Sequence, residues 1–222
     1  MSLHFTVLGA NGFIGRHLVE HLKNQGYECD TPAKYDDFIF SKHLGHVIYA
    51  IGLTADFRTR PLDTVEAHVC VLRRLMKEGS FDSLTYLSST RLYSGSSSTS
   101  ETAALVVNPY KLEDLYNISK LMGESLCLHA GKANTKVVRL SNIVGLRSDS
   151  DSFIDQLLEE GYTAGSIKLH TALDSKKDYL YIDDAVSLIG AIALSSKSGI
   201  FNVASGEGVE NAQVIDFLET EM

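Results

Sequence analysis

The chain of 222 residues lacks the features that mark disulfide-rich, membrane-spanning and nucleic-acid-binding proteins. It has only three cysteines, and its basic residues are outnumbered by acidic ones, 20 to 28. No stretch approaches the roughly 18 consecutive apolar residues that a membrane-spanning helix needs, so we expect no membrane partner. The formal net charge of −8 also argues against a nucleic-acid partner, which would require a basic surface.

The cysteines and histidines show no pattern of metal ligands. Cys29, Cys70 and Cys127 are isolated in the sequence, and among the eight histidines only His43 and His46 form a loose pair. The N-terminus starts with a strand-like run and lacks the basic region of a signal peptide. We therefore expect a cytoplasmic protein without a metal site, in which the cysteines act as small hydrophobic residues.

What the sequence does contain is a regular alternation of apolar patterns, within a composition of 44% hydrophobic and 22% charged residues. Strand-like runs bounded by glycine alternate with segments of helical spacing. Strands are predicted at 3–9, 27–30, 45–52, 83–90, 135–145, 178–182 and 199–208, and helices at 12–26, 61–79, 108–131, 153–161, 183–196 and 211–222. This order predicts an α/β fold with a doubly wound parallel sheet covered by helices on both faces.

Two helix starts are predicted from local signals. Pro109 is expected near the beginning of the helix at 108–131, since proline is tolerated in a first turn. Asp183 or Asp184 is expected to cap the helix that follows the strand at 178–182.

The first strand–helix junction reads GANGFIG, with glycines at positions 9, 12 and 15. Gly9 permits a tight turn, Gly12 lets the backbone approach a pyrophosphate, and Gly15 allows the helix to pack closely on the sheet. The helix N-terminus then offers free N–H groups to the phosphates. The alternative is a glycine turn without a ligand. The predicted cofactor-binding residues in this loop are Gly9, Asn11, Gly12, Phe13, Ile14 and Gly15.

The residue that selects between NAD and NADP is ambiguous. An acid ending the second strand would bind the ribose 2′-hydroxyl and favour NAD. Asp30 comes early for this role, Ala33 occupies the expected place, and Asp36 and Asp37 come late. Lys34 could instead accept a 2′-phosphate, so the cofactor is predicted as NAD or NADP.

Tyr116 and Lys120 lie four residues apart in the helix at 108–131, and therefore on one face of it. Such a pair is either a surface coincidence or half of a redox active site, and the surrounding motifs have to decide. Several segments carry the pattern of one family: VLGANGFIGRHLVEHL, HVIYAIGLT, YLSSTRLYSG, YNISKLMGE, VRLSNIVG, KKDYLYIDDAV and FNVASGEG. In order and spacing the chain resembles the extended short-chain dehydrogenase/reductase family, in its nucleotide-sugar branch of NAD(P)-dependent epimerases and dehydratases.

The resemblance implies catalytic roles for three residues. Tyr116 would be the acid/base, and Lys120 would lower its pKa and hold the nicotinamide ribose. Ser89 would donate a hydrogen bond to the substrate oxygen and stabilise developing charge. Ser88 or Thr90 would take this role if the register were shifted by one residue.

The resemblance also implies binding residues. Ala50 and Gly52 would let the cofactor lie against the backbone after the strand at 45–52. Thr90 and Asn142 would contact the substrate, although Asn142 could equally form a turn after its strand. Arg139 is expected to pair within the fold. The serine-rich loop at 94–103 could fold over the substrate or be a mobile surface loop.

The chain departs from the family pattern in three ways. Thr90 and Arg91 stand where the sugar 4,6-dehydratases carry an Asp-Glu pair, which disfavours that dehydratase activity. Only a short segment separates 27–30 from 45–52, as in some keto-sugar reductases. The chain also ends soon after FNVASGEG, so we expect a small open pocket, a substrate other than a full nucleotide-sugar, or a partner that completes the site.

Taken together, the sequence predicts one Rossmann-like domain over 1–222, in which 145–180 and 199–222 form a small substrate-binding portion. The predicted function is an NAD(P)-dependent epimerase or reductase that acts on a sugar or a nucleotide-linked sugar. The alternative is a non-enzymatic NAD(P)-binding sensor or scaffold on the same fold. The resemblance implies a homodimer, formed through the helix that bears Tyr116 and Lys120 and the helix before it.

Overall fold

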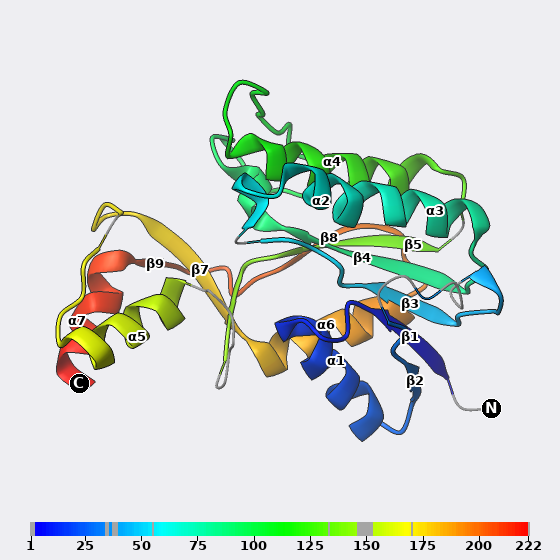
Figure 1. The fold of residues 1–222 in the computed structure, drawn as a ribbon, viewed down its shortest axis with the longest axis horizontal. Coiled ribbons are helices and arrows are strands. Elements are labelled where there is room, and N and C mark those ends of the chain that lie inside the picture. Colours follow the sequence, from blue (N-terminus) through cyan, green and yellow to red (C-terminus); the bar gives the residue numbers. More distant parts are fainter. Residues whose placement is uncertain are drawn as a thin grey trace.

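The computed structural model describes residues 3–33, 36, 40–54, 56–132, 134–145, 153–169 and 171–221. Lys34 and Asp37, two of the residues considered for cofactor selection, lie outside these ranges. The described chain forms a larger body around a central sheet, with a smaller portion beside it that includes the C-terminal helix (Figure 1).

The central sheet has six strands in the order β2-β1-β3-β4-β5-β8, and every neighbouring pair is parallel. The strands are β1 (His4–Leu8), β2 (Glu28–Asp30), β3 (His46–Tyr49), β4 (Ser83–Ser89), β5 (Thr135–Leu140) and β8 (Gly199–Val203). The predicted parallel α/β architecture is therefore confirmed.

Helices cover both faces of this sheet (Figure 1). One face carries α1 (Phe13–Asn24) and α6 (Ile182–Leu194), and the other carries α2 (Pro61–Val65), a π-helical turn (Glu66–Cys70), α3 (Val71–Glu78) and α4 (Asp114–His129). Side chains of a strand alternate between the two faces. In β1, Phe5 and Val7 pack in the core with α1 and α6, whereas Leu8 packs in the core with α3 and α4.

The order of the strands creates a crevice at one edge of the sheet. The chain passes from β1 to β2 on one side and then crosses to β3 on the other side of β1. Ligands of open α/β sheets bind at the carboxyl ends of strands where the direction of winding reverses. In the described part of the chain no further strand lies between β2 and β3, which agrees with the short segment seen in the sequence.

The smaller portion contains a second sheet in the order β6-β7-β9. Its strands are β6 (Asn142–Val144), β7 (Lys176–Tyr181) and β9 (Gly208–Glu210), and its helices are α5 (Phe153–Ala164) and α7 (Asn211–Glu221). β6 pairs with β7 in parallel, whereas β9 pairs with β7 antiparallel. The sequence did not predict β9.

Two predicted helix starts were wrong. The long helix begins at Asp114, and turns occupy 108–113, because Asn108 Oδ1 accepts the N–H of Tyr110 at 3.0 Å and Asp114 Oδ2 accepts the N–H of Asn108 at 2.8 Å. Such local side-chain bonds compete with helix formation. The cap of α6 is Tyr181, so the two predicted aspartates lie in the first turn, where a negative charge favours the helix dipole.

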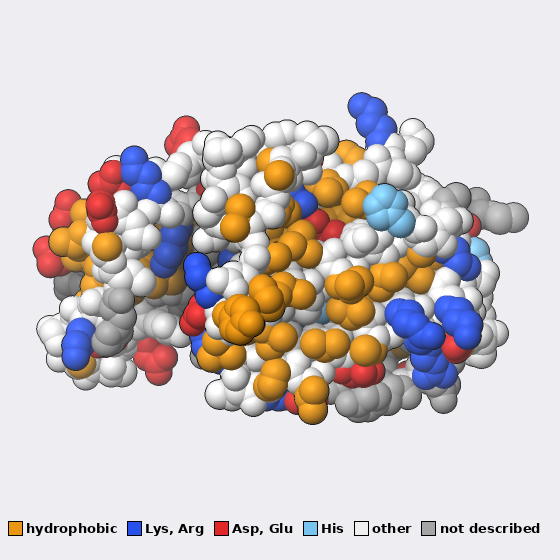
Figure 2. Space-filling model, turned by 90° about the horizontal axis from the view of Figure 1, so that it is seen from above, with side chains coloured by type: hydrophobic (Ala, Val, Ile, Leu, Met, Phe, Trp, Pro, Cys, Tyr) orange, Lys and Arg blue, Asp and Glu red, His pale blue; other side chains and the backbone are white. Residues whose placement is uncertain are grey.

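The outer face of α2 and α4 exposes apolar side chains. Figure 2, which views the molecule from this side, shows hydrophobic side chains gathered over the middle of the face. The large exposed apolar residues of α2, α4 and the segment before α4 include Leu62, Tyr110, Leu112, Met122 and Leu128, which we call the α2/α4 apolar face. None of the helices in the described ranges is both long and apolar enough to span a bilayer.

Candidate active site

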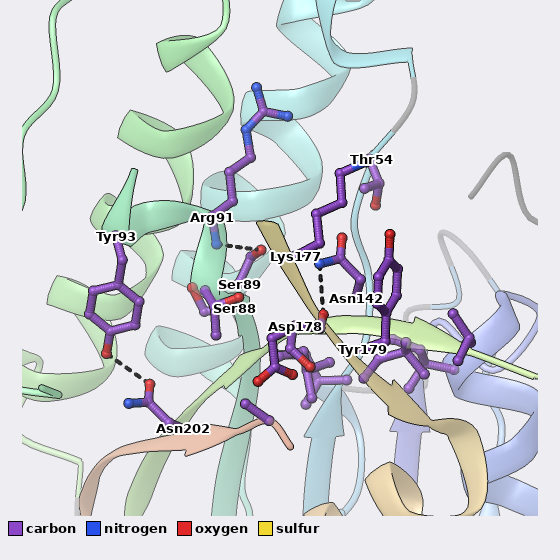
Figure 3. A pocket seen from close by; sticks show the side chains of 18 of the residues that line it. Thr54, Ser88, Ser89, Arg91, Tyr93, Asn142, Lys177, Asp178, Tyr179 and Asn202 are labelled. Atoms are coloured by element: carbon purple, nitrogen blue, oxygen red, sulfur yellow. Dashed lines mark hydrogen bonds between the residues drawn. The ribbon is translucent and has the colours of Figure 1, made fainter. Parts of the chain in front are cut away.

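A cavity of about 1250 Å³ opens at the carboxyl edge of the central sheet. One wall comes from the glycine loop and from the ends of β3, β4 and β5, and the facing wall comes from β7 (Figure 3). Of the predicted site residues, most line this cavity: Gly12, Phe13, Ile14, Gly15, Ala50, Gly52, Ser89, Thr90, Tyr116, Lys120 and Asn142. The topology has thus brought together residues from across the chain.

The glycine loop is shaped as a cradle for a phosphate group. Gly9 has φ +88°, a conformation that side chains disfavour, and its carbonyl accepts the N–H of Gly12 at 3.1 Å. A Cβ on Gly15 would lie 2.2 Å from the Gly9 oxygen, so the close packing requires glycine. The helix α1 starts at Phe13, and the N–H groups of a first turn have no intrahelical acceptor. This arrangement fits the pyrophosphate of a dinucleotide.

The other two predicted loop residues do not line the cavity within the described chain. Gly9 lies beneath the loop, packed against the backbone of Ala50, and Asn11 is exposed in the turn. Their predicted contacts with a cofactor stay predictions.

Tyr116 lies in α4 with only 5% of its surface exposed, against the rings of Phe57 and His68. Burial raises its pKa above the ordinary value, while a hydrogen bond with Ser89 and the positive charge of Arg91 lower it. The sequence pattern predicted that Lys120 would lower this pKa. In the structure the nearby groups that act in that direction are Ser89 and Arg91.

Lys120 is engaged with the main chain. Its Nζ donates to the carbonyl of Leu87 at 2.9 Å and lies 6.0 Å from the centroid of the Tyr116 ring. Burial lowers the pKa of this amine to about 7, although the charge of Glu124 opposes the shift. The amine is therefore much easier to deprotonate than that of an ordinary lysine.

Ser89 carries the hydroxyl that forms a hydrogen bond with Tyr116. It ends β4, and its Oγ accepts the N–H of Arg91 at 3.2 Å in the turn that follows (Figure 3). Ser88, the alternative in a shifted register, instead donates to Glu124 Oε1 at 2.6 Å. Thr90 follows as the first residue of the turn Thr90–Tyr93 and also lines the cavity.

A buried ion pair joins α4 to β5 and also contacts Ser88 at the end of β4. Arg139 donates to both carboxylate oxygens of Glu124, from Nε at 3.0 Å and from Nη2 at 2.7 Å. The expectation that Arg139 pairs within the fold is confirmed. Arg139 also donates to the hydroxyl of Tyr93 at 2.8 Å, and that hydroxyl donates to Asn202 Oδ1 at 2.8 Å (Figure 3).

Asn202 also holds the serine-rich loop against the sheet. Its Nδ2 donates to the carbonyl of Thr99 at 2.8 Å, and its main-chain N–H donates to Glu101 Oε1 at 3.2 Å. Ser94 and Thr99 of this loop line the cavity. The loop is therefore tied to β8 beside the site.

His68 is a residue that the sequence reasoning missed. It is fully buried in the π-helical turn, and its Nε2 accepts the N–H of Leu53 at 3.2 Å. The proton must then sit on Nδ1, which lies 2.8 Å from the hydroxyl of Ser119, and Ser119 donates to the carbonyl of Tyr116 at 2.9 Å. Burial lowers the pKa of His68 to about 2, so this link between the loop after β3 and α4 is uncharged.

The facing wall of the cavity comes from the smaller portion. Asn142 begins β6 rather than a turn, and its Nδ2 donates to the carbonyl of Asp178 in β7 at 2.9 Å (Figure 3). Lys177, Asp178 and Tyr179 of β7 line the cavity, and the sequence did not single them out. No group of three or more histidine, cysteine or acidic residues that could hold a metal ion occurs in the described ranges.

With this geometry in view, the comparisons with known proteins decide the family. The model of the NAD dependent epimerase/dehydratase family matches residues 5–204. The chain belongs to this family. Membership in the NAD dependent epimerase/dehydratase family confirms the resemblance drawn from the motifs, and the family description names NAD as the cofactor.

Solved structures share the fold. A structure of MoeE5 with UDP-glucose and NAD is 20% identical, with a TM-score of 0.84, and the match covers 99% of this chain and 82% of that one. TunA, an NAD-dependent NDP-hexosamine 5,6-dehydratase, is 20% identical with a TM-score of 0.84 over 98% and 81% of the two chains. UDP-N-acetylglucosamine 4-epimerase from Bacillus cereus is 20% identical with a TM-score of 0.71 over 99% and 81%. No curated protein matched the chain.

Proposed function

We propose that the chain is an NAD-dependent epimerase or reductase that acts on a nucleotide-linked sugar. One observation carries this proposal: Ser89, Tyr116 and Lys120 line a single cavity together with the glycine cradle. Family membership supports it, and MoeE5 and TunA are related in fold. No observation favours the alternative of a non-enzymatic sensor or scaffold.

The cofactor would occupy the cradle and the ends of β1 and β3. The N–H groups of Gly12–Gly15 would hold its phosphates, and Ala50 and Gly52 would leave room beside the backbone. A Cβ on Gly52 would already lie 3.5 Å from Lys120 Nζ, so a larger side chain there would crowd the site. When bound, NAD would supply a hydride acceptor and, in its oxidised form, a positive charge.

The side chains of the site would transfer the proton that accompanies hydride transfer. Tyr116 would exchange a proton with a substrate hydroxyl, while Ser89 would donate a hydrogen bond to the same oxygen. Because burial raises the pKa of Tyr116, the phenol needs nearby positive charge to act as a base, and Arg91 supplies part of it. Lys120 would stay beside the Tyr116 ring, where its Nζ donates a hydrogen bond to the carbonyl of Leu87.

Substitution of Tyr116 by phenylalanine tests the mechanism. The variant Tyr116→Phe keeps the ring packing against Phe57 and His68 but removes the proton, so turnover is expected to fall by about 10²- to 10⁴-fold. Tyr110→Phe is the matched control, since Tyr110 is 98% exposed and lies outside the cavity lining. Activity of Tyr116→Phe at the wild-type rate would show that the proposed mechanism is wrong.

The two reactions differ in cofactor balance. We propose to follow the absorbance of reduced nicotinamide during turnover of a nucleotide-sugar. Stoichiometric consumption of the reduced nicotinamide identifies a reductase. Product formation without net consumption of the nicotinamide identifies an epimerase. The same assay with NAD and NADP decides which coenzyme the protein uses, a question for which the sequence offered Asp30, Lys34, Asp36 and Asp37 without choosing among them.

Two further parts of the proposal concern the surroundings of the site. The smaller portion is proposed to bind substrate, because β7 forms the wall opposite the glycine cradle. A homodimer is proposed to form through the α2/α4 apolar face, since contiguous apolar surface on a soluble protein marks an interaction site.

A further inference from the structure

Arg91 occupies a position of unusual charge beside the proposed reaction centre. It follows Ser89 by two residues, and its main-chain N–H donates to Ser89 Oγ. At this position, where the sugar 4,6-dehydratases carry a carboxylic acid, the chain departs from the family pattern. The substitution of a cation for an acid changes what this position can bind.

The guanidinium of Arg91 is held in place by aromatic rings. Its Cζ lies 5.1 Å from the ring centroid of Phe57 and 5.5 Å from that of Tyr116, both within the range of a cation–π contact. Within the described chain the guanidinium makes no hydrogen bond or ion pair. The side chain is thus ordered by packing while its hydrogen-bond donors stay available.

The nearest carboxylates act on Arg91 only at a distance, and each has another partner. Glu113 accepts from Arg58 Nε at 3.3 Å. Asp114 accepts the N–H of Asn108 at 2.8 Å and the side-chain amide of Asn117 at 2.7 Å. These groups do not neutralise Arg91 through direct contact.

The charges that line the cavity are mostly positive, although the whole chain carries −8. The charged lining residues are Arg91, Lys120, Lys176, Lys177 and Asp178. Lys176 pairs with Glu210 at 3.2 Å, and Asp178 accepts the N–H groups of Ser205 and Gly206 at 3.0 and 2.7 Å. A cavity lined mostly by positive charge in an acidic protein attracts a ligand of negative charge.

Lys177 is a second cation without a carboxylate partner in the described chain. Its Nζ lies 3.0 Å from the centroid of the Phe153 ring, and burial lowers its pKa. Figure 3 shows the side chains of Arg91 and Lys177 extending toward the same side of the cavity. Arg91 and Lys177 thus give the cavity lining two cations without a carboxylate partner in the described chain, which suits an anionic group.

We propose that Arg91 binds a carboxylate on the sugar ring of the substrate, so that the preferred substrate is a nucleotide-linked hexuronate. This inference rests on the proposed function. The guanidinium lies against the ring of Tyr116, and the main chain of Arg91 bonds to Ser89, so an anion bound by Arg91 in the cavity would lie near the reacting hydroxyl, as a ring carboxylate does. The planar fork of arginine matches the two oxygens of a carboxylate.

The test compares two ligands that differ only at this group. UDP-glucose and UDP-glucuronic acid differ by a hydroxymethyl and a carboxylate, and their dissociation constants are measured by calorimetry with NAD-saturated protein. Wild type is expected to bind UDP-glucuronic acid about ten- to a hundredfold more tightly, as for a hydrogen-bonded charged group. Arg91→Gln is expected to lose this preference while it keeps its affinity for UDP-glucose.

Arg73→Gln is the matched control. Arg73 lies exposed on α3 outside the cavity lining, so this variant has the same change of charge and is expected to keep the preference. Equal affinity of wild type for the two ligands would overturn the inference and leave the proposed function intact. A preference for UDP-glucuronic acid that survives in Arg91→Gln would also overturn the inference. An equal loss of affinity for both ligands in this variant would overturn it too, because Arg91 would then support the structure of the site and not bind the carboxylate. Failure of wild type to bind either ligand would count against the proposed function itself.

Discussion

The buried pair of Glu124 and Arg139 gives a quantitative test of the structure. Each side chain is 3% exposed, and the two form a bidentate contact at 3.0 and 2.7 Å. The change Glu124→Gln keeps the shape of the side chain but removes its negative charge. Arg139 would then remain buried with only the Tyr93 hydroxyl, a carbonyl and a neutral amide as partners.

Breaking such a pair leaves an uncompensated buried charge, which costs about 3–5 kcal/mol. Because the glutamine oxygen can still accept one hydrogen bond from Arg139, we expect a loss near the lower end, about 3 kcal/mol in the free energy of unfolding. The change is measured by urea denaturation, with two probes to check that unfolding is two-state.

A surface pair of the same chemistry provides the control. Arg74 Nε lies 3.1 Å from Glu78 Oε2, with side chains 51% and 44% exposed. Glu78→Gln is expected to cost about 1 kcal/mol or less, because water screens the pair. If Glu124→Gln destabilises the protein no more than Glu78→Gln, the reasoning from burial is wrong.

Two further predictions concern Lys120 and the α2/α4 apolar face. The pKa of Lys120 is about 7 in the folded protein, whereas the ordinary value is 10.5. At pH values between these two, the amine is protonated in the unfolded chain and has lost its proton in the folded chain. Wild type should therefore gain stability relative to Lys120→Met as pH rises from 7 to 9, by up to about 2 kcal/mol in urea denaturation, and a pH-independent difference would contradict this. On the apolar face, Leu62→Lys combined with Met122→Lys is expected to convert a dimer into a monomer by light scattering, whereas Tyr162→Lys, an exposed apolar position on α5, is expected to leave it dimeric. A monomeric wild type would refute the proposed dimer.

The sequence predicted the order of strands and helices because their apolar periodicity reflects burial on a two-faced sheet. The run at 3–9 was predicted as a strand because it is apolar and ends at Gly9, and in the structure its Phe5 and Val7 enter one core and Leu8 the other. The errors arose where local polar contacts decide the backbone. Asn108 and Asp114 hold turns in a segment whose pattern favoured a helix.

The site was predictable to the extent that its motifs are local. The glycine loop and the pair of Tyr116 and Lys120 are readable because each lies within one turn or helix. The role of His68 was not, because its partners are a loop N–H and the hydroxyl of Ser119, which is 51 residues away in the chain. The environment of Arg91 likewise depends on rings from separate segments.

The neutral state of His68 has a consequence for enzymology. With a pKa of about 2, this imidazole keeps a single proton across the whole working range, so its bonds to Leu53 and Ser119 do not weaken in mild acid. An inflection near neutrality in a rate profile would ordinarily be assigned to a histidine. Because burial lowers the pKa of Lys120 to about 7, the amine in the cavity can produce such an inflection, whereas His68 cannot.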